Sequence, residues 1–343
     1  MTNAAQVSVI IPCWNEVAYI DACLDSLLRS DYPQEHVEVL VVDGLSEDGT
    51  RTIIERYIKR YRRIRLLDNP RHVTPVALNI GIRAARGDVI MRMDAHVIYP
   101  PDYISRSVAA LQETGADNVG GVLVTRPADD TAVARAIAAA LAHPFGVGNA
   151  HFRTGVDEPR WVDTVPFGCY PREVFDRIGL FDEELVRDQD DEFNQRLLRH
   201  GGRLLLVPTI ASEYYARASL EQLWRMYFQY GYFKPLVVRK LGGVLTARQL
   251  APGLFVGILL LTGLLAPWLA VARPLVGLVL AGYAAADLAV ATSIAWRVGG
   301  RVGLAATVVF PVLHVAYGLG YLLGVFDFLI RNRRRGPAVS LSR

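Results

Sequence analysis

The chain has 343 residues, of which 52% are hydrophobic, and a formal net charge of +3. This length allows one large domain or two ordinary ones. The small, dispersed charge argues against a nucleic-acid-binding protein, and no nucleic-acid partner is expected. Cys13, Cys23 and Cys169 have no metal-binding spacing and cannot all pair with one another. They favour a reducing compartment, so the polar part of the chain is predicted to face the cytoplasm.

Strands and helices are predicted to alternate through the first hundred residues. Short apolar runs predict strands at residues 7–11, 37–42, 64–67 and 89–93. Helices are predicted between them, at residues 20–28, 50–60 and 75–85. Because short connections join these elements, the alternation predicts an α/β fold whose parallel sheet is covered on both faces.

The pattern is less regular beyond residue 100. A helix is expected at about residues 102–111 and a strand near 118–125. A long irregular segment at 126–160 follows, with an Ala-rich helix at about 131–142. The glycines of this segment suggest a mobile loop over the crevice of the fold.

Acidic side chains stand where two of the predicted strands end. Asp43 follows the second strand and Asp94 the fourth. The carboxyl ends of parallel strands meet at one edge of a sheet, so both should face one crevice. The turns lack the glycine-rich phosphate-binding fingerprints of dehydrogenases and P-loop enzymes. An acidic crevice suits a nucleotide diphosphate only if a divalent cation lies between the acids and the phosphates.

Several motifs occur together in residues 7–240. They are Pro12-x-x-Asn15-Glu16, Asp43-Gly-x-Ser46-x-Asp48-Gly49-Thr50, Asn79-x-Gly81, Gly87-Asp88 and Asp94-x-His96. In this order they resemble the family 2 glycosyltransferases, and members with a membrane-attached apolar tail in particular. The resemblance implies a GT-A fold, which is a Rossmann-like mixed sheet, and a UDP-sugar donor.

The resemblance also implies a donor site. Its expected nucleotide-sugar-binding residues are Pro12, Glu16, Asp43, Ser46, Asn79, Asp94, Arg172, Gln222 and Arg225. Asp43 would lie beside the base, expected to be uracil, in a pocket lined by Pro12 and Glu16. Asp94 and His96 would hold a divalent cation, Mn²⁺ or Mg²⁺. The imidazole replaces the second acid of the more common Asp-x-Asp and favours Mn²⁺. The alternative for His96 is a hydrogen-bonded turn residue.

A catalytic base is expected in the acidic stretch 182–192. Acids at a helix amino end can simply stabilise the helix dipole, but that needs one or two of them. The family places its base second in an E-D-x-E/D-L pattern. Alignment on Glu192 and Arg196 puts the base at Asp190, with Gln189 in place of the usual Glu. Asp191 is the alternative, because the doubled acid makes the register ambiguous. One base opposite one leaving group predicts transfer with inversion.

The carboxyl-terminal third is predicted to be membrane-attached. Residues 1–217 would be the catalytic domain, 218–248 amphipathic interface helices, 249–331 transmembrane helices and 332–343 a basic tail. Apolar segments at 250–272, 274–296 and 302–330 are each long enough to span a bilayer. Their length favours three spans. The Arg-rich end favours two, with the first segment re-entrant or interfacial. The predicted location is the inner membrane, with the catalytic domain in the cytoplasm.

These observations predict an inverting glycosyltransferase of surface polysaccharide or glycolipid assembly. It would move a sugar, with glucose as first choice, from a UDP-sugar to a lipid-linked, polyprenyl-diphosphate-type acceptor. A processive polysaccharide synthase is an alternative, weakened because two or three spans hardly enclose a polymer channel and Gln222-x-x-Arg225 lacks the tryptophan of its Q-x-x-R-W motif. The second alternative is a noncatalytic nucleotide-sugar-binding membrane subunit. It has no need of Asp43, Asp94, His96 and Asp190 together.

Overall fold

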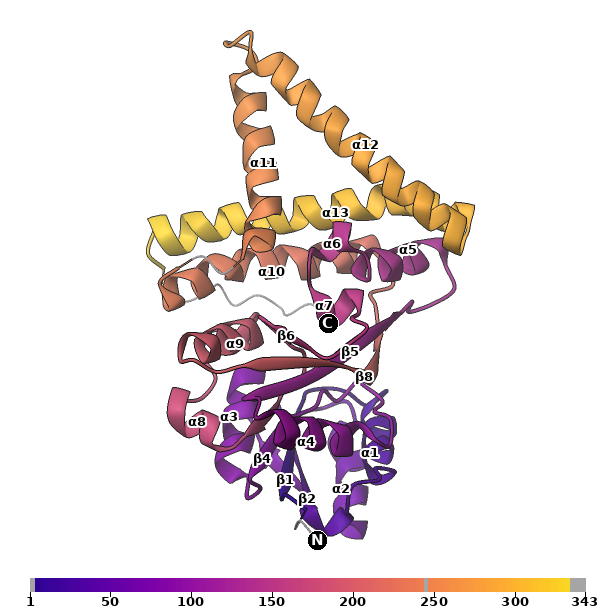
Figure 1. Ribbon diagram of the computed structural model, residues 1–343, viewed down its shortest axis with the longest axis vertical. Helices are drawn as coiled ribbons and strands as arrows, with labels where there is room; N and C mark the ends of the chain where they lie inside the picture. The colour runs from indigo at the N-terminus through magenta and orange to yellow at the C-terminus, as the bar shows by residue number, and fades with distance from the viewer. Residues whose placement is uncertain (1–3, 244–245, 334–343) are drawn as a thin grey trace. The chain divides into compact units, whose positions relative to one another are not determined.

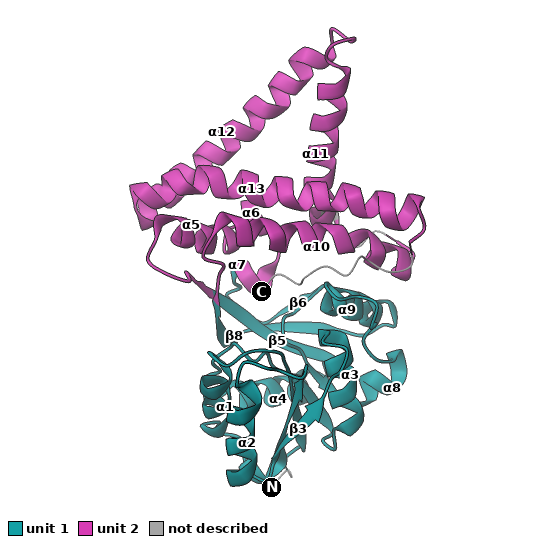
Figure 2. Cartoon of the chain, turned by 180° about the vertical axis from the view of Figure 1, so that it is seen from behind, with its two compact units in different colours: residues 1–124, 155–214 teal, residues 125–154, 215–343 magenta. Residues whose placement is uncertain are grey.

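The computed structural model describes residues 4–243 and 246–333. By its internal contacts the chain divides into two units, residues 1–124 with 155–214 and residues 125–154 with 215–343 (Figure 2). The segment 125–154 thus belongs with the carboxyl-terminal helices, although the sequence analysis grouped it with the catalytic domain. The predicted function of each domain stays a prediction, and the two units are described separately.

A single mixed sheet organises the first unit (Figure 1). Its strand order is β3-β2-β1-β4-β7-β5-β8-β6. The strands are β1 (Val7–Cys13), β2 (Val37–Asp43), β3 (Ile64–Asp68), β4 (Val89–Arg92), β5 (Asn118–Arg126), β6 (Arg160–Val162), β7 (Cys169–Pro171) and β8 (Leu204–Tyr215). The four strands predicted first are mutually parallel, whereas β7 runs antiparallel to β4 and β5, and β6 antiparallel to β8. The prediction of a GT-A-type mixed sheet is confirmed.

Helices follow the strands in this unit. They are α1 (Ile20–Leu28), α2 (Thr50–Arg60), α3 (Thr74–Ala84), α4 (Tyr103–Thr114), α8 (Glu173–Ile178) and α9 (Gln189–Arg199), with a 3-10 turn, η1 (Gln34–His36). Strand β1 is buried at all but one position, as expected for a strand in the interior of a parallel sheet. Helix α3 packs closely on β1, because a Cβ at Gly81 would lie 2.4 Å from the Ile10 side chain.

The sequence analysis missed several elements. Strand β8 is twelve residues long, but Pro208 and the polar Thr209, Ser212 and Glu213 interrupt its apolar pattern. Strands β6 and β7 have three residues each, too few to show a period. The segment predicted to be irregular contains two short helices, α6 (Pro144–Val147) and α7 (His151–Thr154), besides the expected Ala-rich helix α5 (Ala132–Leu141).

The second unit is helical. Besides α5, α6 and α7 it contains α10 (Leu220–Leu241), α11 (Ala247–Leu265), α12 (Ala272–Val298), α13 (Gly300–Gly324) and a π-helical turn, η2 (Val325–Ile330). Three of its helical stretches, 248–265, 272–298 and 300–330, are apolar and long enough to cross a membrane. The prediction of carboxyl-terminal apolar helices that are candidate spans is confirmed.

Candidate active site

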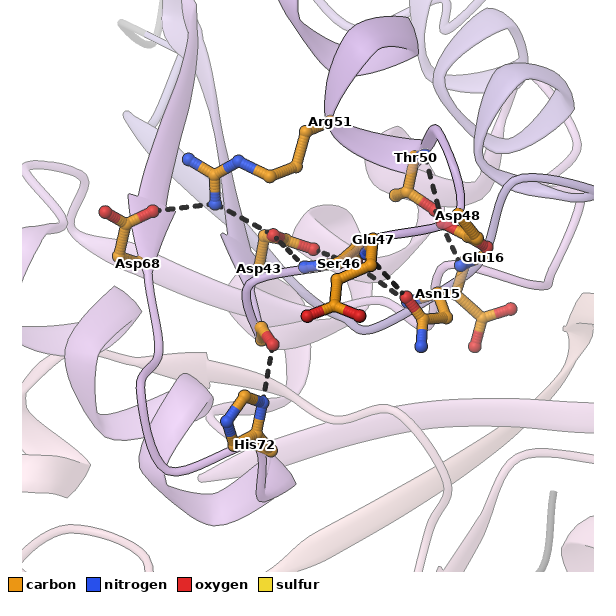
Figure 3. Close-up of polar contacts among 11 residues, drawn as sticks. Asn15, Glu16, Asp43, Ser46, Glu47, Asp48, Thr50, Arg51, Asp68 and His72 are labelled. Carbon is orange, nitrogen blue, oxygen red and sulfur yellow. Dashed lines mark hydrogen bonds and ion pairs between the residues drawn. The ribbon is translucent and has the colours of Figure 1, made fainter.

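Two turns at the carboxyl ends of β1 and β2 are tied together. The backbone N–H groups of Asn15 and Glu16 donate to side chains of the second turn, Ser46 Oγ at 2.6 Å and Thr50 Oγ1 at 2.8 Å (Figure 3). The N–H of Val17 donates to Asp48 Oδ2 at 3.1 Å. Asn15 Oδ1 in turn accepts the Glu47 N–H at 3.0 Å. The first two sequence motifs therefore form one polar platform, to which both Glu16 and Ser46 belong.

Asp43 lies at the base of this platform, and its side chain is fully buried. Its carboxylate accepts the Ser46 N–H at 2.9 Å, the Ser46 hydroxyl at 2.5 Å and an Arg51 N–H at 2.9 Å. Arg51 also pairs with Asp68 at 2.8 Å. A buried carboxylate needs such partners, because desolvation of an unpaired charge is costly. Asp43 therefore shapes the turn that would receive a ligand.

An aromatic side chain that the sequence analysis passed over stands beside Asp43. Trp14 is 40% exposed and packs against the ring of His72, with 5.6 Å between ring centroids. A Cβ at Gly44 would lie 3.1 Å from Trp14, so the glycine permits this close approach. The His72 Nδ1 lies 2.6 Å from the Gly44 carbonyl oxygen. An exposed indole in a polar loop was the available signal for Trp14.

Arg92 is the residue that links the two predicted catalytic regions. Its Nε and Nη2 groups each lie 3.1 Å from Asp94 Oδ1, and its Nη1 lies 3.2 Å from Asp190 Oδ2. The Arg92 side chain is only 10% exposed. Burial lowers the pKa of this guanidinium, but the charges of Asp94 and Asp190 outweigh it and hold the pKa above its ordinary value. One buried cation thus bridges the predicted metal ligand and the predicted base.

The backbone of Asp94 is fixed independently of its side chain. Its N–H donates to the hydroxyl oxygen of Tyr99 at 2.7 Å, and the N–H of Met93 donates to the Ile10 carbonyl at 3.0 Å. Tyr99 is buried and packs edge-on against Tyr103. Burial and the Asp94 charge raise the pKa of Tyr99 well above its usual range, so its hydroxyl stays protonated.

His96 stands at the edge of the platform. Its side chain is 46% exposed, and its Nδ1 lies 3.5 Å from Glu16 Oε1. Within residues 4–243 and 246–333 no three His, Cys, Asp or Glu side chains are grouped as a metal site. Asp94 and His96 offer one carboxylate and one imidazole, a donor pair that suits Mn²⁺ better than Mg²⁺. The Asp94 carboxylate faces Arg92 and the His96 imidazole faces Glu16, so their joint role as cation ligands stays a prediction.

The acidic side chains at the start of helix α9 make two different kinds of contact. Glu192 is buried and holds Arg196 with contacts of 2.8 and 3.0 Å, while Arg196 also donates to the carbonyls of Ile178 and Leu180. This pair anchors the helix. Asp190, in the first turn, is 38% exposed and faces Arg92. Asp191 belongs to the same turn and is partly exposed.

Two predicted site residues make other contacts. Asn79 is buried, and its amide exchanges hydrogen bonds with the backbone of Phe181 and donates to Glu183. It joins α3 to the segment before α9. Arg172 donates to the Gly87 carbonyl, at the opposite end of β4 from Asp94. The structure does not bring Arg172 together with the Asp94 group.

Gln222 and Arg225 lie in the first turns of α10, in the second unit. Gln222 Oε1 accepts the Ala218 N–H, and its own N–H donates to Ser219. Arg225 forms an exposed pair with Glu221. Their predicted contact with the donor stays a prediction.

Cysteine chemistry does not contribute to the site. Cys13, Cys23 and Cys169 are free and buried. Burial raises the pKa of Cys23 to about 12, and raises the pKa of Cys13 and Cys169 as well, so all three are protonated thiols at neutral pH.

Comparison with known proteins identifies the family. The profile described as "Glycosyl transferase family 2" matches residues 8–179. The succinoglycan biosynthesis protein ExoA of Rhizobium meliloti is 32% identical over 324 residues, which cover 93% of this chain and 95% of that protein. The chain is a family 2 glycosyltransferase. The predicted resemblance to the family 2 glycosyltransferases is confirmed.

The name of another relative of this glycosyltransferase includes a dolichyl-linked sugar phosphate. A dolichyl N-acetyl-α-D-glucosaminyl phosphate 3-β-D-2,3-diacetamido-2,3-dideoxy-β-D-glucuronosyltransferase of Methanococcus voltae is 31% identical over 271 residues, 76% of this chain and 82% of that protein. Among solved structures, a mannosyltransferase from Pyrobaculum calidifontis in complex with GDP-Man and Mn²⁺ has a TM-score of 0.61 at 21% identity. It covers 95% of this chain and 88% of its own, and shows the shared fold.

Proposed function

We propose that this glycosyltransferase moves glucose from a UDP-sugar to a lipid-linked acceptor, with inversion at the anomeric carbon. The observation that carries the proposal is the bridge from Asp94 through Arg92 to Asp190. Both carboxylates pair with one guanidinium. Asp94 is suited to the diphosphate side of a donor, and Asp190 is suited to accept a proton from an acceptor hydroxyl. A donor whose anomeric carbon lies between them would meet both.

The donor side of the proposal uses the platform. Asp43, Pro12 and Ser46 would border the base and ribose, with Glu16 alongside. Asp94 and His96 would hold the divalent cation, which supplies charge neutralisation of the departing diphosphate and can lower the barrier by several kcal/mol. Support for a cation comes from their donor chemistry and from the Mn²⁺ in the Pyrobaculum structure of the same fold.

On the acceptor side, Asp190 would take the proton of the attacking hydroxyl. A sugar hydroxyl is a weak nucleophile, and a positioned base typically contributes about 10²–10⁴-fold to the rate. The exposure of Asp190 leaves room for an acceptor, and one of its oxygens forms an ion pair with Arg92. Asp191, one residue later, is the alternative base. A single displacement of this kind inverts the configuration.

The lipid-linked acceptor is supported by the apolar helices and by the relatives. An acceptor with a polyprenyl-diphosphate anchor stays in the bilayer, so an enzyme attached to that bilayer meets it directly. The names of the Rhizobium and Methanococcus relatives point to polysaccharide assembly and to a dolichyl phosphate acceptor, respectively. We place the enzyme in the inner membrane with its first unit in the cytoplasm, where nucleotide sugars are made.

The test is a transfer assay with the full-length protein in detergent. Radiolabelled UDP-glucose, other UDP-sugars and GDP-mannose are each offered with a polyprenyl-diphosphate-sugar acceptor and Mn²⁺. We expect a labelled glycolipid from UDP-glucose, with the new linkage inverted relative to the donor. A glycolipid formed only from GDP-mannose would refute the donor assignment, and a product of retained configuration would refute the single displacement.

A further inference from the structure

The three apolar helices of the second unit differ in how much protein covers them. In the most apolar stretches of α11 and α12 only 17% and 11% of the residues are buried, against 56% for α13 with η2. Leu264 on α11 and Leu278 on α12 are 65% and 70% exposed. Helices whose large apolar side chains face outward all round need a lipid environment. Helix α13 is instead largely covered by protein.

Helix α10 covers α13 along much of its length, and the two run side by side (Figure 1). Glycines make the approach possible. A Cβ at Gly231 would lie 2.0 Å from the Tyr317 carbonyl oxygen, and one at Gly320 would lie 2.2 Å from that of Phe228. Farther along, a Cβ at Gly324 would lie 2.3 Å from the Tyr232 carbonyl oxygen. With backbones this close, α10 and α13 must occupy the same depth in a bilayer.

Helix α10 is too polar to cross a bilayer. It carries Glu221 and Arg225 near its start, Lys234 in its middle, and Arg239 and Lys240 at its end. An Arg or Lys at the centre of a spanning helix costs about 2.5–3.5 kcal/mol. The Glu221 and Arg225 side chains are 72% and 63% exposed, which suits the water-facing side of an interface.

Polar contacts bind α13 to α6 and α12, and bind η2, which continues α13, to α10. His314 Nε2 lies 2.8 Å from the Phe145 carbonyl of α6, so it carries the proton and its Nδ1 accepts from the Tyr283 hydroxyl at 2.8 Å. At the other end, Asp327 accepts from Tyr232 of α10 at 2.7 Å and pairs with Arg333 at 3.2 Å. The contact between Asp327 and Tyr232 would be lost if α13 and η2 left α10 to cross the membrane.

Helices α11 and α12 form a hairpin whose tip leads away from this layer (Figure 2), while residues nearer their other ends, such as Gly253 and Ala295, pack against α13. The hairpin tip holds Trp268, 73% exposed, and the far end of α12 holds Trp296, 87% exposed. At a rise of 1.5 Å per residue, the 27 residues of α12 extend about 40 Å, enough for a hydrocarbon core of about 30 Å. Exposed tryptophans at both ends mark the two interfaces.

We infer that the chain crosses the bilayer twice, through α11 and α12 only, and that α13 lies in the interface beside α10. The sequence analysis had considered the first apolar segment as the one that does not span; the packing points to the last. Two crossings return Arg331 and Arg333, which follow η2, to the side of α10. This arrangement agrees with the preference of basic residues for the cytoplasmic side. The lipid-linked acceptor would then approach the surface formed by α10 and α13.

Single cysteines introduced into the full-length protein test the inference by their sidedness. Glu221→Cys reports the side of α10, Ala270→Cys the hairpin tip, and Ser342→Cys, outside the described residues, the end of the chain. A membrane-impermeant maleimide is applied to spheroplasts and to inside-out vesicles of the expressing bacterium. The unsubstituted protein gives the background of the buried native thiols. Leu288→Cys, in the middle of α12, should react from neither side.

We expect Ser342→Cys to react on the same side as Glu221→Cys, and Ala270→Cys on the opposite side. Reaction of Ser342→Cys on the side of Ala270→Cys would mean three crossings and overturn the inference. Reaction of all three on one side would overturn it too, because the hairpin would not cross. If a variant is not produced, an epitope tag after Arg343, read by protease access, decides the same point. None of these readouts depends on the proposed sugar transfer.

Discussion

At the scale of single residues, the account depends on Arg92. A charged side chain in a short apolar strand is unexpected, and its cost is offset by two carboxylates, one two residues away and one 98 residues later in the chain. The pairing with Asp94 fixes one oxygen of the predicted cation ligand. The pairing with Asp190 fixes the first turn of α9. We propose that Arg92 positions both groups without touching the substrate.

Replacement of Arg92 tests this positioning role. We expect Arg92→Met to lower kcat by about 10²-fold or more, because a misplacement of about 1 Å can cost that much, while UDP binding by calorimetry stays close to wild type. Arg92→Lys should recover part of the loss, because an ammonium group keeps the positive charge but cannot contact two carboxylates with the planar geometry of a guanidinium. The control is Arg65→Met, which removes another partly buried arginine paired with a carboxylate, Glu38. Wild-type kcat in Arg92→Met would refute the role.

The identity of residue 96 should set the preference for the metal. His96→Asp converts the Asp-x-His of this chain to Asp-x-Asp, and oxygen ligands suit Mg²⁺ better than an imidazole does. Bound metal is first removed with EDTA, and Mn²⁺ or Mg²⁺ is then added back. We expect the ratio of activity with Mn²⁺ to activity with Mg²⁺ to be lower in this variant than in the wild type. An unchanged ratio would indicate that His96 is not a ligand. His72→Asp, in a loop outside the predicted metal pair, serves as the control.

At the scale of elements, the strands that end in the site were readable from the sequence. The apolar runs of β1, β2 and β4 are each bounded by turn residues. The acids that follow β2 and β4, Asp43 and Asp94, indicated where the site would be. The partnership of Arg92 with Asp190 was not readable, because it joins β4 to α9 across a long separation. Asn79 shows the same limit. The resemblance implied that Asn79 contacts the donor; its amide pairs with Phe181 and Glu183, and the donor contact stays a prediction. Strand β8 was hidden by its own proline and polar residues.

Glycine contacts between helices give a prediction at this scale. Gly320→Ala should destabilise the protein, because the new Cβ meets the Phe228 carbonyl oxygen at 2.2 Å and backbone cannot easily move aside. Overpacking of this kind typically costs about 1–3 kcal/mol. Gly277→Ala on α12 is the matched control, since nothing lies within 4 Å of its Cβ position. Thermal unfolding in detergent compares them, and equal melting temperatures for the two variants would contradict the packing of α13 on α10.

At the scale of the whole molecule, the chain passes between its two units three times, near residues 124, 154 and 214. The excursion at 125–154 ties the helical unit to the middle of the catalytic sequence. The chain therefore connects the unit that contains the mixed sheet to the unit that contains the apolar helices at three points in the sequence. Composition alone indicated the apolar third, but not this interleaving.

Membrane attachment follows from the exposed apolar faces of α11 and α12. We expect the full-length protein to stay in the membrane pellet after alkaline carbonate and high-salt washes and to need detergent for release. An interfacial protein held by charge would be removed by salt, because salt screens such attraction. Release by either wash would contradict the spanning hairpin.

The central claim is that Asp190 is the base of an inverting transfer. The most direct measurement compares the purified wild-type protein with Asp190→Asn, with UDP-glucose, Mn²⁺ and the polyprenyl-linked acceptor, while UDP binding is measured in parallel. Asp191→Asn is the matched control on the neighbouring residue. The account predicts loss of at least about 10²-fold in transfer rate for Asp190→Asn, with UDP affinity nearly unchanged and Asp191→Asn still active. Full transfer activity in Asp190→Asn would contradict it.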